Sequence, residues 1–419
     1  MTAVRTIKSF LVELKSVLQS EGHSFPLRFV TGNQSCDMDS TVCALTYSYM
    51  NYLHSGKWMI PLLNIPRAEL RLRKDISKLL QAHKITNDLL YFVEDLDRLV
   101  TLSSPMSSTY ELVLVDHCNV QGDQWEQYLK DGKATITAIV DHHEDEGIAT
   151  EANPRIIKST GSCSSLVFNY WYNQFQDKGI FQDQTELVEL LLAPLLLDTS
   201  NMSQKVEEPD VIALGVYRQI LEKDPSALQI TSLFSDMHHS SFNDSFLKQY
   251  TKKLKSYKKN LDGFTFYDIL RKDYKSFTFV SNLKPIKVGF SSLSSDFEYC
   301  CTVHKDDFVS GASQLLSASG LDLLVMTASF TDKQTRKYSR QFSLFYAKDS
   351  GNLALFESIP KLVNQSLDLN NDVPNIELYT DFIDSIGETT NYTFTLFNQG
   401  NTAASRKQVV PAVKKAIEQ

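Results

Sequence analysis

The chain places carboxylate and imidazole side chains directly after short apolar runs, at points where buried strands or helices would end. Four such runs each precede an acidic motif: Asp37-Met38-Asp39-Ser40, Asp116-His117, Asp141-His142-His143 and Asp198-Thr199-Ser200. Carboxylates that gather at one place repel one another unless cations lie among them, and divalent cations such as Mg²⁺ and Ca²⁺ prefer oxygen ligands. The pattern therefore predicts a metal centre built from residues that are far apart in the sequence.

The first motif combines two alternating acidic residues with a tight turn. Asp37 and Asp39 follow Gly32 ahead of a helical stretch, so both carboxylates could face one ligand, and the positive end of the helix dipole would suit a phosphate. The same string would also serve as a plain capping turn, with Ser40 as the cap of the helix. Taken alone, this motif leaves both interpretations open.

The other motifs offer candidates for distinct roles. Asp116 suits a bridging position between two cations, because its carboxylate has one oxygen for each. His142 would ligate through one ring nitrogen while a neighbouring acceptor holds the other nitrogen, and Asp198 would complete the ligand set from a separate element. His143 and His117 lie beside these ligands. They could donate to a phosphoryl oxygen or protonate a leaving group, or simply pack around the centre.

Short apolar runs and longer amphipathic stretches alternate from about residue 25 to residue 200. The predicted strands are Leu27–Val30, Trp58–Asn64, Leu89–Glu94, Glu111–Val115, Ile136–Val140 and Arg155–Lys158. The predicted helices include Ser40–Leu53, Leu70–His83, Gln124–Lys130, Cys163–Gln174 and Thr185–Leu196. This alternation is typical of an α/β fold with a mostly parallel sheet flanked by helices. Ligands of such sheets bind beyond the carboxyl ends of the strands, where the acidic motifs fall.

A second, smaller half follows this region. A helix from Pro209 to Lys223 closes the first domain, assigned to residues 1–223, and the Ser- and Asp-rich stretch 224–244 is predicted to be a linker or hinge. Residues 245–419 are predicted to form an α/β domain with a mixed sheet. They begin with a basic helix and contain four apolar runs: Ile286–Leu293, Leu321–Ser329, Gln341–Ala347 and Tyr392–Phe397.

Composition excludes some classes of protein. The chain has 419 residues and a formal net charge of −8, so two or three domains are expected and a general nucleic-acid binder is disfavoured. The six cysteines show no CxxC pattern, which is typical of reduced thiols in the cytoplasm. No apolar stretch is long enough to span a membrane, and we expect a cytoplasmic protein without a membrane partner.

Three further polar segments have open interpretations. Ser159–Ser165 could offer backbone amides to a phosphate or could simply begin a capped helix. By composition alone, the adjacent cations Arg406 and Lys407, after Ser405, are typical of a solvated turn. The lysine-rich helix Phe246–Asn260 is either a solvated face or a rim that attracts a polyanion by its electrostatic field.

The four acidic motifs resemble, in order and rough spacing, those of the DHH phosphoesterase superfamily. Ser405-Arg406-Lys407-Gln408 resembles the substrate-binding signature of its pyrophosphatase and exopolyphosphatase branch, and the chain has no GGGH string of the kind found in the nuclease branch. Asn33, where pyrophosphatases have His, resembles fungal exopolyphosphatases and prune proteins. The intact His142-His143 differs from the DHR motif usual in prune. The segments 161–172 and 197–202 are especially similar to the cytosolic exopolyphosphatases of yeasts, although His117 departs from their Asn.

The resemblance implies a metal-dependent exopolyphosphatase that removes terminal orthophosphate from linear inorganic polyphosphate. Two divalent cations, Mg²⁺ in preference to Mn²⁺, Co²⁺ or Zn²⁺, are expected among Asn33, Asp37, Asp39, Asp116, His142 and Asp198. The implied catalytic residues are His143, Asp116 and Arg406. The implied substrate-binding residues are His143, Arg406, Lys407, Ser405 and His117. An inorganic pyrophosphatase and a prune-like phosphodiesterase or interaction protein remain alternatives, and a monomer that binds no nucleic acid is expected.

Overall fold

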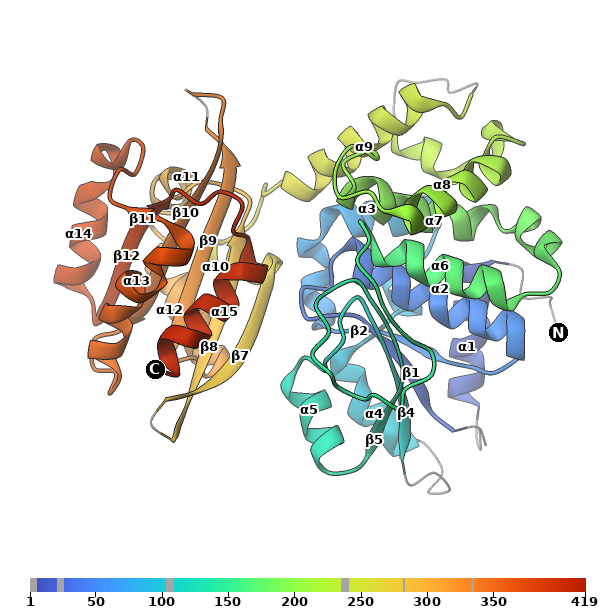
Figure 1. Ribbon diagram of the computed structural model, residues 1–419, viewed down its shortest axis with the longest axis horizontal. Helices are drawn as coiled ribbons and strands as arrows, with labels where there is room; N and C mark the ends of the chain where they lie inside the picture. Colours follow the sequence, from blue (N-terminus) through green and yellow to red (C-terminus); the bar gives the residue numbers. More distant parts are fainter. Residues whose placement is uncertain (1–5, 21–25, 103–108, 235–240, 282, 333–334) are drawn as a thin grey trace. The chain divides into compact units, whose positions relative to one another are not determined.

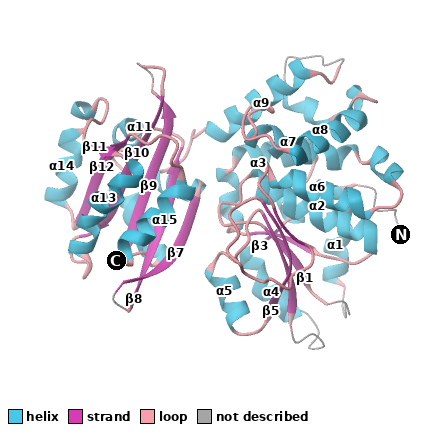
Figure 2. Cartoon of the chain, viewed as in Figure 1, coloured by secondary structure: helices cyan, strands magenta, loops and turns pink. Residues whose placement is uncertain are grey.

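The computed structural model describes residues 6–20, 26–102, 109–234, 241–281, 283–332 and 335–419. The chain divides into two compact units, Met1–Asn260 and Leu261–Gln419. Figure 1 labels the elements of each unit, and Figure 2 distinguishes their helices from their strands. Among the helices of the described residues, none combines the length and the apolar character that a membrane crossing needs.

The first unit is built around a six-stranded sheet with the order β3-β2-β1-β4-β5-β6, in which all neighbouring strands are parallel. Its strands are β1 (Arg28–Thr31), β2 (Ile60–Leu63), β3 (Tyr91–Phe92), β4 (Tyr110–Val115), β5 (Ala134–Asp141) and β6 (Arg155–Ile157). This order is that of a doubly wound sheet, and the direction of winding reverses between β1 and β4. Ligands of such sheets bind at that reversal, beyond Thr31 and Val115.

Helices flank this sheet, as predicted. They are α1 (Ile7–Gln19), α2 (Met38–Ser55), α3 (Lys74–Ala82), α4 (Leu96–Leu102), α5 (Asp123–Lys130), α6 (Cys163–Gln174), α7 (Thr185–Asp198), α8 (Glu208–Leu221) and α9 (Asp244–Lys259). Helix α2 packs against β1 and β2, and α7 packs against both α2 and α6. The residues of α7 from Leu187 to Leu197 are all buried, because the helix has protein around its whole circumference. The apolar run that ends at Asp198 is therefore a buried helix.

One predicted helix is interrupted in the structure. The predicted helix Leu70–His83 is divided at Arg73 into a 3-10 helix, Arg67–Leu72, and α3. Arg73 is buried, and its guanidinium donates to the carbonyl oxygens of Ser35 (2.9 Å from Nε, 2.7 Å from Nη2) and Cys36 (3.2 Å). These three hydrogen bonds connect Arg73, where the predicted helix is interrupted, to the loop that follows β1.

The predicted linker 224–244 is partly folded onto the first unit. It contains the 3-10 helices Pro225–Ala227 and Gln229–Leu233, and the latter contacts α3 and α7. Residues 235–240 of this stretch lie outside the described residues. The basic helix α9, which the sequence assigned to the second half, packs against α3 and α7 through buried side chains such as Leu247 and Leu254. The first compact unit therefore extends to Asn260.

The second unit contains a mixed sheet with the order β11-β12-β10-β9-β8-β7, in which only the β8–β9 pair is parallel. Its strands are β7 (Tyr274–Ser281), β8 (Lys284–Leu293), β9 (Leu323–Thr331), β10 (Tyr338–Ala347), β11 (Leu369–Asn370) and β12 (Tyr392–Gln399). Its helices are α10 (Phe266–Lys272), α11 (Phe297–Val303), α12 (Phe308–Ser319), α13 (Leu353–Leu367), α14 (Thr380–Thr389) and α15 (Arg406–Ile417). The α/β class with a mixed second sheet is as predicted.

Candidate metal centre

The residues predicted to ligate metal come from the carboxyl edge of the first sheet and from two helix ends. Asn33 and Asp37 lie in the loop after β1, Asp116 directly follows β4, and His142 directly follows β5. The other two, Asp39 and Asp198, lie in the first turn of α2 and at the last residue of α7. The structure thus brings together side chains from four separate parts of the sequence.

Asp116 lies at the middle of this group. Its Oδ2 accepts hydrogen bonds from the Ser40 hydroxyl (2.6 Å) and from Asn33 Nδ2 (2.8 Å), while its Oδ1 lies 3.2 Å from His142 Nε2 and 3.9 Å from His143 Nδ1. Burial alone would raise the pKa of Asp116, but His142, His143 and Ser40 outweigh it and hold the pKa below its usual range. Ligand atoms of Asp116, His142 and His143 all lie within 4.8 Å of one another, as in a metal site.

Asp39 is fixed by the start of another helix. Its carboxylate is 2% exposed and accepts from the Ser162 hydroxyl (2.9 Å) and from the backbone amides of Cys163 (2.7 Å) and Ser164 (2.9 Å). These amides form the N-terminus of α6, whose dipole favours an anion. Because Asp39 accepts from the Cys163 and Ser164 amides, these two amides are not available to a phosphate.

Asp37, rather than Ser40, caps helix α2. The helix begins at Met38, and the Asp37 carboxylate accepts from the Ser40 amide at 3.0 Å. The prediction that Ser40 is the cap is therefore wrong. The Ser40 hydroxyl instead donates to Asp116, so the turn joins two of the acidic motifs.

The acidic side chains carry more negative charge than this buried space accommodates. Burial, followed by the charge of Asp116, raises the pKa of Asp39 to about 7. The pKa of Asp198 is also raised well above its usual value, by burial first and by Asp39 second. A divalent cation would offset both effects, because it stabilises the ionised forms. Hard carboxylate and amide oxygens with an imidazole nitrogen are a ligand set that fits such cations.

The two histidines after β5 have different surroundings. His142 Nδ1 lies 3.1 Å from the Thr160 carbonyl oxygen, so this nitrogen carries the proton and Nε2 faces Asp116. His143 Nδ1 lies 2.7 Å from Asp141 Oδ1, and its side chain is 27% exposed. His142 is therefore oriented as a ligand would be, whereas His143 is accessible to a bound substrate.

The remaining predicted site residues lie near this group or in the second unit. His117 is buried, with Nδ1 2.9 Å from the Val115 carbonyl oxygen. In the second unit, Ser405 is the N-cap of α15, in a capping box with Gln408. Arg406 is the first residue of that helix. Its Nη2 lies 2.8 Å from Asp273 Oδ1 and its Nη1 donates to the Asp273 carbonyl oxygen at 3.0 Å, while Lys407 is exposed.

Two lysines of the basic helix α9, which the sequence offered as either a solvated face or a rim for a polyanion, lie beside the candidate metal centre. Lys255 Nζ is 3.0 Å from the hydroxyl of Ser200, just beyond the end of α7, and the charge of Lys258 acts on Asp198 to lower its pKa. Burial, together with Lys259 and Lys258, lowers the pKa of Lys255. The dense lysine spacing of the helix was the only signal for this position.

Asp210 is a further residue that the sequence did not indicate. Its buried carboxylate accepts from the Gly161 amide (2.8 Å), the Ser162 amide (3.3 Å) and the Ser165 hydroxyl (2.7 Å). The same loop carries Thr160, whose carbonyl oxygen orients His142. Asp210 therefore positions the groups that hold His142 and Asp39.

Asp210→Asn is expected to weaken metal binding. The amide of Asn would direct an NH₂ group at donors that now meet carboxylate oxygen, at a cost of about 1–3 kcal/mol. Misplacing a group that orients a metal ligand typically lowers metal affinity about 10–100-fold. Titration with Mn²⁺ and thermal unfolding of the metal-free protein measure the two effects, with the exposed Asp224→Asn as control. Reduced stability with unchanged metal affinity would restrict Asp210 to a structural role.

Comparison with known proteins identifies two family domains in the chain. A model of the DHH family, N-terminal domain, matches residues 28–195, and a model of the DHHA2 domain matches residues 252–416. A Schizosaccharomyces pombe protein, provisionally named an exopolyphosphatase, is 29% identical over 99% of this chain and 96% of its own length. Human "Exopolyphosphatase PRUNE1" is 26% identical over 98% of this chain and 79% of its own length.

A solved structure shares the fold. The crystal structure of a Methanococcus jannaschii protein, provisionally assigned to the family II inorganic pyrophosphatases, matches with a TM-score of 0.53 and 19% identity. The match covers 93% of this chain and 99% of that one.

Proposed function

The chain belongs to the DHH phosphoesterase superfamily, with a DHHA2 domain after its DHH domain, and from this premise we propose that it is a metal-dependent exopolyphosphatase. Its substrate would be linear inorganic polyphosphate, from which it releases terminal orthophosphate. The observation that carries the proposal is the buried acidic group around Asp116, with lysines of α9 beside it. A site with this combination suits a polyanion bound through divalent cations.

Two divalent cations, Mg²⁺ before Mn²⁺, would be held by Asn33, Asp37, Asp39, Asp116, His142 and Asp198. When bound, such cations supply an activated nucleophilic water and neutralise charge on the phosphoryl oxygens. The chain's own side chains would orient the metal ligands and bind the substrate.

Each of these groups has a role that its contacts suggest. Asn33 and Ser40 hold Oδ2 of Asp116, so that Oδ1 stays directed at His142. His143 donates from Nδ1 to Asp141, so in the doubly protonated ring Nε2–H is the group that would donate to a phosphoryl oxygen or transfer its proton to the leaving phosphate. In the second unit, Arg406 and Lys407 at the start of α15, with Ser405, would neutralise phosphoryl oxygens.

The proposal is tested by measuring phosphate release against polyphosphate chain length, beside pyrophosphate and a cyclic nucleotide, with Mg²⁺ and with a chelator. We expect metal-dependent release from polyphosphate that exceeds release from pyrophosphate. Preference for pyrophosphate would make the protein a pyrophosphatase. Cleavage of the cyclic nucleotide with no phosphate released from polyphosphate would favour the prune-like alternative.

Neutralising lysines of α9 is expected to impair the hydrolysis of long polyphosphate more than the hydrolysis of pyrophosphate. Lys252→Gln combined with Lys255→Gln should raise KM for long polyphosphate, because long chains extend over more of this basic surface. The KM for pyrophosphate should change much less. The exposed pair Lys414→Gln and Lys415→Gln, on α15, serves as a charge-matched control. Equal effects on both substrates would contradict a role for α9 in binding long chains.

Asn33→His should shift the metal preference from Mg²⁺ toward Mn²⁺ and improve pyrophosphate cleavage. An imidazole nitrogen is a softer ligand than an amide oxygen, and it suits transition metals better than Mg²⁺. The ratio of kcat/KM with Mn²⁺ to that with Mg²⁺ is expected to rise about tenfold, equivalent to ~1.4 kcal/mol. Steady-state rates with both metals and both substrates give the answer, and unchanged ratios would remove Asn33 from metal selection.

A further inference from the structure

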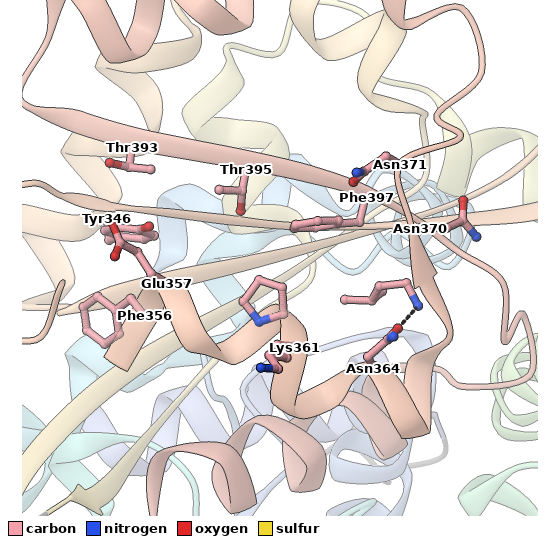
Figure 3. A pocket seen from close by; sticks show the side chains of 12 residues that line it. Tyr346, Phe356, Glu357, Lys361, Asn364, Asn370, Asn371, Thr393, Thr395 and Phe397 are labelled. Carbon is pink, nitrogen blue, oxygen red and sulfur yellow. Dashed lines mark hydrogen bonds between the residues drawn. The ribbon is translucent and has the colours of Figure 1, made fainter. Parts of the chain in front are cut away.

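The second unit contains a cavity of about 560 Å³ between α13 and the sheet. Figure 3 shows side chains of β12, including Thr395 and Phe397, on one side of it and side chains of α13, including Lys361 and Asn364, on the other. Its volume lies within the range of about 300–1,000 Å³ found for small-molecule sites. None of its lining residues belongs to the proposed metal centre.

The cavity exists because neighbouring strands present different side chains to α13. On β10, Phe342, Leu344 and Tyr346 are buried in the core beneath this helix. On β12, which pairs with β10, the same face carries Thr393, Thr395 and Phe397. Two hydroxyls and one aromatic ring thus stand where a continuous apolar layer would close the space.

Three donors that line the cavity, on Asn364, Asn370 and Thr395, have no hydrogen-bond acceptor among the described residues. Asn364 Oδ1 accepts from the Leu369 amide at 2.6 Å, and Asn370 Oδ1 accepts from the Asp372 amide at 3.1 Å. Each amide therefore directs its NH₂ group elsewhere, and within the described part of the chain neither NH₂ donates to another residue. The Thr395 hydroxyl is buried and has no hydrogen-bond partner among these residues. A buried hydroxyl of this kind is unfavourable unless a ligand or water satisfies it.

The charges of the lining limit what the cavity would bind. Lys361 and Glu357 are its charged residues, and Lys361 makes no ion pair with a described residue. One cation matches a single phosphate, whereas Glu357 beside it disfavours a polyanion such as polyphosphate. The partly accessible aromatic ring of Phe397 provides a surface for a flat ring system, whereas the Phe356 and Tyr346 rings are buried in the wall of the cavity.

From these features we propose that the cavity binds a nucleoside monophosphate. The base would pack against Phe397, its ring nitrogens would accept from Thr395 and from the amides of Asn364 and Asn370, and the phosphate would pair with Lys361. Such a site would let a nucleotide bind the second unit independently of the metal centre.

Calorimetric titration of the full chain in excess chelator tests this site, because chelation prevents nucleotide binding through divalent cations at the metal centre. AMP should bind the unmodified protein. Thr395→Val, which keeps the side-chain shape, should weaken AMP about tenfold because it removes a buried hydrogen bond. Lys361→Gln should weaken AMP but leave adenosine unchanged, because adenosine has no phosphate.

Lys414→Gln, which removes a charge on α15 that does not line the cavity, is the control and should bind AMP normally. Thermal unfolding of each variant checks that the second unit remains folded. The proposal is overturned by absence of AMP binding to the unmodified protein, by equal AMP affinity in all variants, or by inorganic phosphate binding as tightly as AMP. Loss of polyphosphatase activity with AMP binding intact would count against the proposed enzyme function alone.

Discussion

Asp116→Asn should remove almost all phosphate release from polyphosphate while the first unit remains folded. Asp116 has a left-handed backbone conformation, with φ at 61°, which Asn tolerates better than most residues. The Asn side chain is also close in size and can still accept from Ser40. What it lacks is the negative charge that faces His142 and would face the cations. Loss of one such group lowers kcat by up to about 10³-fold in comparable sites.

The measurement is kcat/KM for polyphosphate at saturating Mg²⁺, together with Mn²⁺ affinity by calorimetry. Both should fall in Asp116→Asn, and thermal unfolding of the metal-free protein should change little. Asp131→Asn, at the end of α5, removes a carboxylate outside the group and should behave as the unmodified protein. Retention of a tenth or more of the activity would contradict a metal-ligating role for Asp116.

The convergence of the acidic motifs was predictable because the geometry of a parallel sheet brings residues that follow different strands to the same edge. Each apolar run fixes where a strand ends, and parallel strands end at one edge, so Asp116 and His142 had to lie near the loop of Asn33. The location of Asp198 at the end of a buried element was predictable for a different reason, since the long apolar run before it had to be buried. The resemblance to a family supplied Asn33, Arg406 and Lys407, which composition alone did not distinguish.

The groups that orient these residues were not predictable in the same way. Asp39 accepts from Ser162, which lies 123 positions further along the chain, and Asp210 accepts from Gly161 across 49 positions. A buried carboxylate needs donors, but no local pattern states which donors the fold will bring to it. Arg73 is a similar case, because its cation is satisfied by backbone carbonyls whose positions depend on the loop conformation.

Differences between the predicted and the observed elements in the second half of the chain have a related cause. Strand β7, at the edge of the mixed sheet, was not predicted, because its buried and accessible residues do not form a continuous apolar run. Helix α9 was placed in the second half because it follows the predicted linker, yet its buried face packs on the first unit. The exposed charges of an amphipathic helix give little information about which neighbouring element its apolar face packs against.

Arg406→Ala should lower kcat/KM for polyphosphate about 100-fold and leave metal affinity unchanged. Its guanidinium is oriented by two contacts with Asp273 and lies at the N-terminus of α15, where anions are favoured. An arginine held in this way binds phosphoryl oxygens through charge-assisted hydrogen bonds, and removal of one group that stabilises developing charge costs about 10²-fold or more. The fold should tolerate the change, because a partly exposed ion pair contributes at most about 1 kcal/mol.

Lys415→Ala, in the last turn of the same helix, is the matched control and should retain full activity. Arg406→Lys separates charge from geometry, since Lys keeps the cation but loses the planar fork. We expect it to recover only part of the lost rate. If Arg406→Ala weakened Mn²⁺ binding as much as it weakened turnover, the arginine would be acting through the metal centre. Its assignment to the phosphoryl oxygens would then be wrong, and the second unit would have to influence the ligands of the first.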